Sequence, residues 1–386
     1  MRIIRTEFVT LFLLAGCVAL LAVPLKVISW FPGDLSFLLA VPIPERPLWH
    51  GHAMLVGYAQ MVLGGYLLTR PGQRTIMLYG TLWLMARAAI FVPGTTGLLL
   101  GAAFNIAVFT MLFIYAGLNF FRAAKRLKSA IPGMIIFLLL LAESLYQAGA
   151  IYGYEMLCEG ALRGVIWLMI LLLFMMGGRI IAAATSGALQ KRDLYRPYMA
   201  QGRLETVGIA ALIAAATTDL AMFPVAISAF FSILAAAIIF CRLWSWRVWL
   251  VWDFFDLTSL HLGYAMLAGG MVFYAVQTLI LGASSLVDFH GALIGGFALL
   301  SITVMCRTVM QRLRFTISLP ISMRIASLCL IASALSRIAA FQDTASRELL
   351  IISGILWECA FIGFIGTLIW LVCRFRSAKI ANANRS

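Results

Sequence analysis

The chain has 386 residues, of which 63% are hydrophobic and 11% are charged. Soluble globular domains are only about 45–50% apolar, so this composition excludes a soluble protein and indicates a polytopic membrane protein. The formal net charge is +14, but the basic residues fall in short clusters between apolar runs. Such clusters are typical of topology signals and argue against nucleic acid as a partner.

Apolar runs of spanning length follow one another along the whole chain. They lie at about 8–30, 48–69, 75–93, 96–121, 131–153, 161–184, 204–223, 224–243, 258–281, 287–309, 317–340 and 348–373. About 20 residues are enough for one helix to cross a bilayer. We therefore predict an all-α fold: a transmembrane helix bundle of about 12 spans, forming a single integral membrane domain over residues 1–386. Its surroundings are the lipid bilayer.

Lysine and arginine gather at alternate ends of these runs. The rich ends carry Arg2, Arg5, Arg70, Arg74, Arg122, Lys125, Arg126, Lys128, Lys191, Arg192, Arg196, Arg203, Arg242, Arg247, Arg307, Arg312, Arg314, Arg374, Arg376 and Lys379. The poor ends carry Arg46, Arg163 and Arg347. Because cytoplasmic loops hold the excess of positive charge, both termini are predicted to be cytoplasmic, which also requires an even number of spans.

The four histidines are the first candidates for a site. His50 and His52 begin the second run, while His261 and His290 lie near ends of the ninth and tenth. An ionisable side chain in a span normally faces the bundle interior, where histidine serves as a hydrogen-bonded structural residue or as a metal ligand. Residues two apart on an α-helix point about 200° apart. His50 and His52 therefore have different partners, unless one of them belongs to the entry loop.

A methionine and several charges extend the set of candidates. Met54 shares a helix face with His50, an arrangement that suits a haem edge or a soft copper ion, although a methionine there also suits ordinary core packing. Arg87 could pair with Glu143, or meet an anion such as a haem propionate. The remaining intramembrane charges are Asp219, Arg337 and Glu358, and Arg337 could pair with Glu358.

Several stretches together resemble the NnrS family of haem- and copper-containing membrane proteins. The segment 49–54 reads Trp-His-Gly-His-Ala-Met and is similar to the family's Trp-His-x-His-Glu-Met, and Gly-Tyr-Leu-Leu-Thr at 65–69 is similar to its Gly-Phe-Leu-Leu-Thr. Gly-Gly-Arg at 177–179 and Leu-His-Leu-Gly-Tyr at 260–264 also match. The stretch from His290 to Val-Met-Cys-Arg at 304–307 is similar to the family's next histidine-containing helix.

The resemblance covers nearly the whole chain, and all four histidines fall on its motifs. One departure is Ala53, which stands where the family usually has an acidic residue. Any role of that carboxylate is therefore lost or moved. Another departure follows Gly-Gly-Arg, where the family's proline and asparagine are replaced by alanines.

The family resemblance implies a function and a set of ligands. It implies haem and copper, a role in the response to nitric oxide or in denitrification-linked metabolism, nitric oxide or metal-nitrosyl species as partners, and the bacterial inner membrane as location. The implied metal ligands are His50, His52, His261 and His290. Met54 and Arg87, singled out above from the residues, complete the set of predicted cofactor-binding residues. Since the chain has no C-x-x-C-H motif, the haem would be non-covalent and b-type.

Two other interpretations stay open on the sequence alone. A secondary transporter of about twelve helices could use Arg87, Glu143 and Asp219 as a midplane charged site. A purely structural or assembly protein would not need the histidines for metal. Whether the chain catalyses a reaction, and its oligomeric state, are not implied by any of these patterns.

Overall fold

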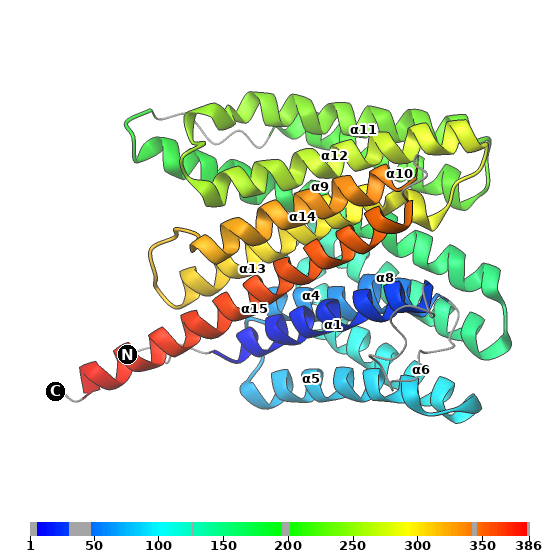
Figure 1. Ribbon diagram of the computed structural model, residues 1–386, viewed down its shortest axis with the longest axis horizontal. Coiled ribbons are helices and arrows are strands. Elements are labelled where there is room, and N and C mark those ends of the chain that lie inside the picture. Colours follow the sequence, from blue (N-terminus) through cyan, green and yellow to red (C-terminus); the bar gives the residue numbers. More distant parts are fainter. Residues whose placement is uncertain (1–5, 31–47, 126, 195–200, 342–345, 384–386) are drawn as a thin grey trace. The chain divides into compact units, whose positions relative to one another are not determined.

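The computed structural model describes residues 6–30, 48–125, 127–194, 201–341 and 346–383. All the regular secondary structure in these ranges is helical, which confirms the predicted all-α class (Figure 1). The chain divides into two compact units. Unit 1 extends to Leu168 and resumes at Leu368, and unit 2 extends from Met169 to Thr367.

Unit 1 contains the helices of the first half of the chain. They are α1 (Glu7–Trp30), α3 (Trp49–His52), the π-helix η2 (Ala53–Tyr58), α4 (Ala59–Leu67), α5 (Gln73–Ala88), η3 (Ala89–Phe91), α6 (Gly94–Leu112), the π-helix η4 (Phe113–Gly117), α7 (Leu118–Ala123), α8 (Leu127–Tyr152) and the start of α9 (Glu155–Gln190). The end of α15 (Ser346–Ala383) also belongs to this unit.

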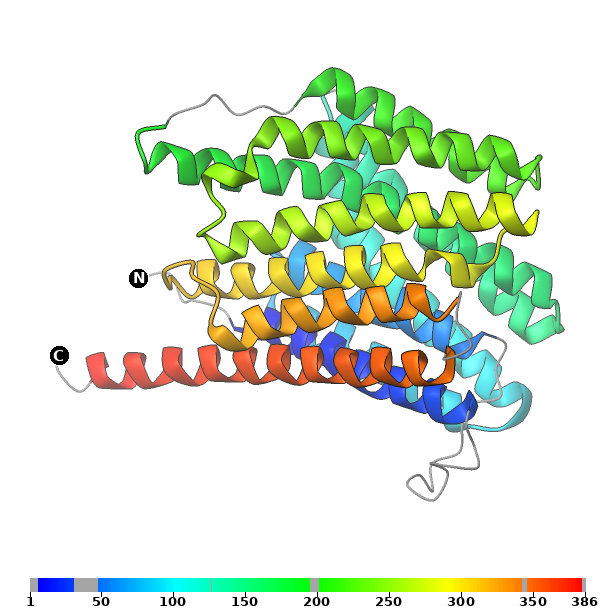
Figure 2. The same ribbon diagram turned by 45° about the horizontal axis from the view of Figure 1, so that its top comes forward.

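Unit 2 contains the remaining helices. They are the rest of α9, α10 (Gly202–Leu220), α11 (Val225–Trp246), η5 (Val248–Leu250), α12 (Phe255–Leu281), η6 (Leu286–Phe289), the π-helix η7 (Gly291–Ala298), α13 (Leu299–Arg312), α14 (Ile321–Ala339) and the first part of α15. Within this unit α11 and α12 lie side by side in both ribbon views (Figures 1 and 2).

Each predicted apolar run coincides with helix in the described ranges, but not every helix is equally suited to a membrane. Nine of the helical segments in these ranges are long and apolar enough to cross a bilayer. The helices at 49–67, 73–91 and 202–220 are not among them. They carry polar residues such as His52, Arg87 and Asp219, which lower their hydropathy. The chain is thus a multi-pass membrane protein.

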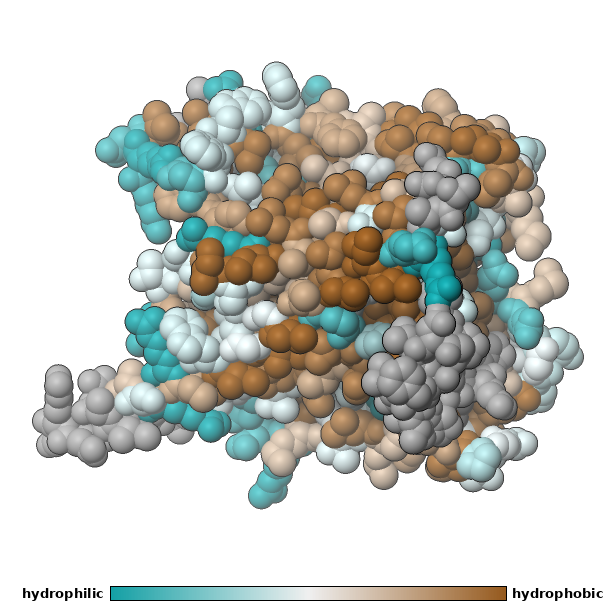
Figure 3. Space-filling view, in the orientation of Figure 1, coloured by the Kyte–Doolittle hydropathy of each residue, from teal (hydrophilic) through white to brown (hydrophobic). Residues whose placement is uncertain are grey.

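Each unit exposes large apolar side chains and buries several charged ones, in addition to its hydrophobic core. Large apolar side chains such as Phe230, Trp244 and Ile362 are exposed, whereas Glu143 and Arg242 are fully buried. On the face seen in Figure 3, hydrophobic residues (brown) predominate along the middle of the helices, and many hydrophilic ones (teal) lie towards helix ends. This distribution is expected where lipid replaces water around the helices, because polar groups then turn inward.

Two of the arginines assigned above to helix-end clusters are not at the surface. Arg242 is fully buried in α11, and Arg307 is buried in α13, where it forms an ion pair with Asp256. Both residues lie within the last two turns of their helices, as the count of charges at helix ends assumed, but their side chains turn inward. Arg2, Arg5, Arg46, Arg126 and Arg196 lie outside the described residues.

Candidate functional site

The four histidines are divided evenly between the two units. His50 and His52 lie in the short helix α3 of unit 1, His261 lies in the second turn of α12, and His290 separates η6 from η7. No group of three or more histidine, cysteine or carboxylate side chains that could hold a metal occurs within the described ranges. Each histidine is therefore considered with its own neighbours.

His50 and His52 point to different partners, as their spacing predicted. The Nδ1 atom of His50 lies 3.1 Å from the carbonyl oxygen of Ala22 in α1. The Nε2 atom of His52 lies 3.0 and 3.1 Å from the two carboxylate oxygens of Glu143 in α8. Both residues are helical, and side chains two apart on a helix project in nearly opposite directions.

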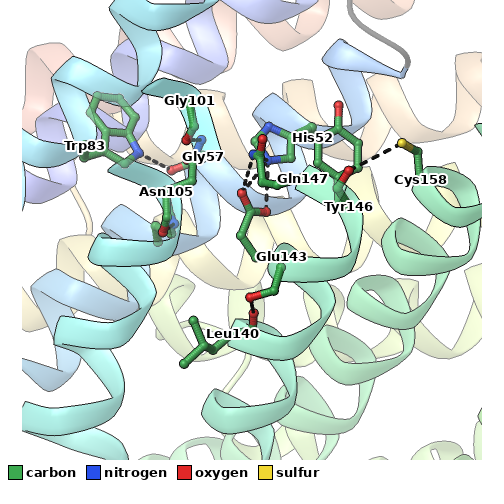
Figure 4. A network of polar contacts seen from close by, with 12 residues as sticks. His52, Gly57, Trp83, Gly101, Asn105, Leu140, Glu143, Tyr146, Gln147 and Cys158 are labelled. Atoms are coloured by element: carbon green, nitrogen blue, oxygen red, sulfur yellow. Dashed lines mark hydrogen bonds and ion pairs between the residues drawn. The ribbon is translucent and has the colours of Figure 1, made fainter. Parts of the chain in front are cut away.

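Glu143 and the residues around it form a buried polar cluster in unit 1 (Figure 4). The Glu143 carboxylate is inaccessible to solvent and also accepts a hydrogen bond of 2.7 Å from the amide of Gln147, one turn further along α8. Tyr146 lies between these two residues in the sequence. Its ring stacks on the His52 imidazole, and the two ring centroids are 4.2 Å apart. The carboxylate thus has two donors, and the His52 ring is held on both its edge and its face.

Arg87 and His52 line one small cavity in unit 1. The guanidinium of Arg87 donates to the side-chain oxygen of Asn105 in α6. Trp49, His52, Arg87, Asn105, Tyr146 and Gln147 are among the residues that line the cavity, whose volume is about 10 Å³. That is about the space that one water molecule needs. The structure therefore brings together two of the predicted site residues, His52 and Arg87.

A π-helix lies next to His52 in the chain. The η2 segment follows His52 directly, and the carbonyl oxygen of Gly57 within it accepts a hydrogen bond of 2.9 Å from the indole of Trp83. Short π-helical segments displace carbonyls from the regular ladder and often occur at functional sites. His290 is likewise followed at once by the π-helix η7. Both histidines have leucine three residues later and glycine five residues later, at Leu55 and Gly57 and at Leu293 and Gly295.

Met54 packs as a core residue. It is partly buried against the hydrophobic cluster of Ala22, Trp49 and Ala53. The alternative of ordinary core packing, left open by the sequence, describes this arrangement, and Met54 is not among the residues that line the cavity.

Three of the histidines share one hydrogen-bonding pattern. The Nδ1 atoms of His50, His261 and His290 lie 3.1, 2.9 and 2.8 Å from the backbone carbonyls of Ala22, Leu257 and Val287. A carbonyl can only accept, so each Nδ1 carries the proton and each Nε2 is the basic nitrogen. This is the arrangement that orients histidines bound to metals through Nε2. For His261, which is 3% exposed, Nε2 has no hydrogen-bond partner among the described residues.

The three remaining intramembrane charges lie in unit 2. Asp219 accepts a hydrogen bond of 2.7 Å from Ser284. The guanidinium of Arg337 lies over the ring of Phe341, with 5.1 Å from Cζ to the ring centroid. Oε1 of Glu358 is buried without a hydrogen-bond partner in the described chain. Glu143 pairs with a histidine, a partner that the sequence did not suggest.

Sequence reasoning missed Tyr146 and Gln147. Their only signal is spacing: a tyrosine and a glutamine follow Glu143 at offsets of three and four within an apolar helix, which places all three on one face. Their role depends on which helix lies opposite, and that is not encoded in the spacing.

Comparison with known families identifies a match along the chain. The family model described as NnrS protein matches residues 3–376. None of the curated proteins compared with the chain matches it. The matched region contains all four histidines and the Glu143 cluster.

Proposed function

Since this chain belongs to the NnrS family, we propose that it is a membrane protein that binds haem and copper and takes part in the response to nitric oxide or in denitrification-linked metabolism. Haem, copper and nitric oxide come from the family resemblance. The observation that carries the proposal is the buried, unpartnered Nε2 of His261, held in the metal-binding tautomer by Leu257.

Haem iron fits the described residues better than a copper centre does. A haem needs one or two axial ligands from the protein, and His261 offers one, with its second nitrogen already bonded to a carbonyl. A copper site usually needs several donors close together, and no such group of three occurs in the described ranges. When bound, haem would supply an iron that accepts small ligands such as nitric oxide.

The chain's own residues would orient and shelter the cofactors. His261 would hold the haem, and His50 and His290, which have the same tautomer, would be further metal ligands. His52 has its Nε2 on Glu143, so in this arrangement it would act by holding the Glu143 carboxylate in place. Arg87 is proposed to meet a propionate or another anionic group. Met54 would contribute packing at the edge of the site.

The proposed placement is the bacterial inner membrane, with about twelve spans, both termini cytoplasmic, and one integral membrane domain over 1–386. The start of α1 and the end of α15 belong to the same unit and lie at the same end of it in Figures 1 and 2. This supports an even number of crossings, because termini on one side require it.

Replacement of His261 tests the proposal. The purified protein is expected to show a Soret band, with haem and copper measurable per chain. His261→Ala should lower haem per chain at least tenfold, because the histidine that would hold the haem is lost. Added imidazole should restore the band by occupying the vacated position.

The matched control is Leu262→Ala, which removes an exposed side chain at the next position and should leave haem content unchanged. A colourless, metal-free protein would refute the proposal and favour the transporter alternative. A Soret band that is the same in His261→Ala and in the unaltered protein would refute the role of His261.

A further inference from the structure

The buried guanidinium of Arg242 in unit 2 is only partly hydrogen-bonded. The residue is in the last turns of α11 and has no exposed surface. Its Nη1 donates to the hydroxyl of Tyr264 at 2.9 Å and to the carbonyl of Phe174 at 3.2 Å. Its Nε and Nη2 have no hydrogen-bond partner among the described residues.

Aromatic rings surround the faces of the guanidinium. Its Cζ lies 4.9 Å from the ring centroid of Phe174, 5.2 Å from that of Trp246 and 5.9 Å from that of Tyr264. Gly178 provides the space for the guanidinium, since a Cβ there would lie 2.1 Å from Nη2. Ring faces attract a cation, but they cannot accept the in-plane hydrogen bonds of Nε and Nη2.

The two unpaired nitrogens define the shape of a ligand. Nε–H and the adjacent N–H of Nη2 point in parallel from one edge of the guanidinium, and this fork matches two oxygen atoms of a single planar anionic group. Leaving such donors buried without an acceptor is costly. The edge therefore suits a carboxylate or an oxyanion with the same two-oxygen geometry.

A third unpartnered donor belongs to a ring that the guanidinium contacts. The Nε1 atom of Trp246, one helical turn after Arg242, is buried and has no hydrogen-bond partner in the described chain. The Trp246 ring contacts both Tyr264 and His261, with centroids 5.7 and 6.2 Å apart. Unpartnered polar atoms thus gather on facing turns of α11 and α12.

A buried acid of the same unit is paired with another arginine. Glu205 of α10 is buried, and its Oε1 lies 3.1 Å from Nε of Arg179. Two guanidinium groups and one carboxylate leave an excess of one positive charge. A singly charged anion would balance it, as buried charges require.

The cluster is close to a helix end. Trp246 is the last residue of α11, so Arg242 is only about 6 Å of helix rise from that end.

From these contacts we propose that Arg242 and Trp246 form a binding site for a singly charged, two-oxygen anionic group. The group would lie on the Nε–Nη2 edge and accept a further hydrogen bond from the Trp246 indole. Its source is either a free small anion or the carboxylate of a bound cofactor. The site itself does not depend on the proposed haem.

Thermal unfolding of the purified protein in detergent tests the site, with formate as the probe and chloride as a single-atom anion of equal charge. Formate should raise Tm saturably and chloride should not. Trp246→Phe keeps the ring but removes the donor, and should weaken the apparent formate affinity about tenfold, the usual effect of one charge-assisted hydrogen bond. Arg242→Gln should abolish the formate effect.

Trp244→Phe is the matched control, because Trp244 is 76% exposed on the same helix, and it should leave the formate affinity unchanged. Haem-free and haem-containing preparations separate the two sources. A formate effect in both supports a free anion, and an effect only without haem supports a cofactor carboxylate. No effect in either preparation, or equal formate affinity in Trp246→Phe and the unaltered protein, would overturn the site. The formate measurement on haem-free protein tests the anion site even if the protein proves not to bind haem.

Discussion

Gly270→Ala is expected to leave little folded protein, because it forces a side chain into the backbone of the neighbouring helix. A Cβ on Gly270 of α12 would lie 2.0 Å from the nitrogen of Ala292 and 2.5 Å from the Ala292 Cα and the Gly291 carbonyl carbon of η7. These are backbone atoms and cannot rotate away. Overpacking usually costs 1–3 kcal/mol, and with rigid neighbours we expect about 3 kcal/mol or more, a large share of a stability of about 5–15 kcal/mol.

The adjacent glycine provides the control. A Cβ on Gly269 would meet no heavy atom within 4 Å. Gly269→Ala should therefore leave folding intact and can stabilise α12 by up to about 1 kcal/mol, the usual difference between glycine and alanine in a helix. The yield of monodisperse protein and its Tm in detergent measure both variants. Equal behaviour of the two would contradict the close contact between α12 and η7.

The same contact bears on the second pair of histidines. Gly291 follows His290, and its own Cβ would lie 3.2 Å from the Cα of Gly270. The close approach of α12 to η7 therefore fixes the backbone beside His290 within unit 2. Small residues at such crossings let helices approach in membranes, where dispersion contacts and hydrogen bonds replace the hydrophobic drive.

The helices of this protein were predictable because hydropathy alone selects them. A run such as 258–281 differs from the observed α12, Phe255–Leu281, by only three residues at one end. The three less apolar helices were found for the same reason, although His52, Arg87 and Asp219 reduce their hydropathy. Hydropathy cannot predict the π-helices η2 and η7, because a local change in backbone hydrogen bonding leaves no periodic signal in the sequence.

The site was predictable only as far as local geometry reaches. The divergence of His50 and His52 follows from helix spacing. The pairing of His52 with Glu143 does not, because 91 residues separate them and the choice between Glu143 with Arg87 and Glu143 with His52 depends on which helices touch. Ala53 carries no carboxylate, and the carboxylate that His52 contacts comes from α8.

The inward orientation of the Arg242 side chain could not be predicted from the sequence either. Read along the sequence, it follows an apolar run and precedes Arg247, so it has the pattern of a helix-end charge. In the structure α11 continues to Trp246 and the guanidinium turns inward among three rings. Inward and outward orientation are indistinguishable in a terminal turn, because both satisfy the same hydropathy profile.

The largest pairwise energy in unit 1 is expected between His52 and Glu143. Glu143→Ala or His52→Ala alone should destabilise the protein by about 3 kcal/mol, since removing one partner leaves the other buried with an incomplete set of hydrogen bonds. Gln147 still donates to Glu143 after loss of His52, but one amide cannot replace both contacts. The double variant should cost at least about 1 kcal/mol less than the sum of the single changes.

A second ion pair in the same unit shows what burial adds. Glu159 and Arg163 are four residues apart on α9, and Nη2 of Arg163 lies 2.7 Å from Oε1 of Glu159. The Glu159 side chain, however, is 45% exposed. Its double-mutant cycle should give only about 0.3–0.5 kcal/mol, measured by thermal unfolding under the same conditions. Coupling of His52 to Glu143 as small as that would mean that the carboxylate is held by Gln147 and the helix alone. The imidazole would then be free to serve another ligand, and His52 would return to the set of proposed metal ligands.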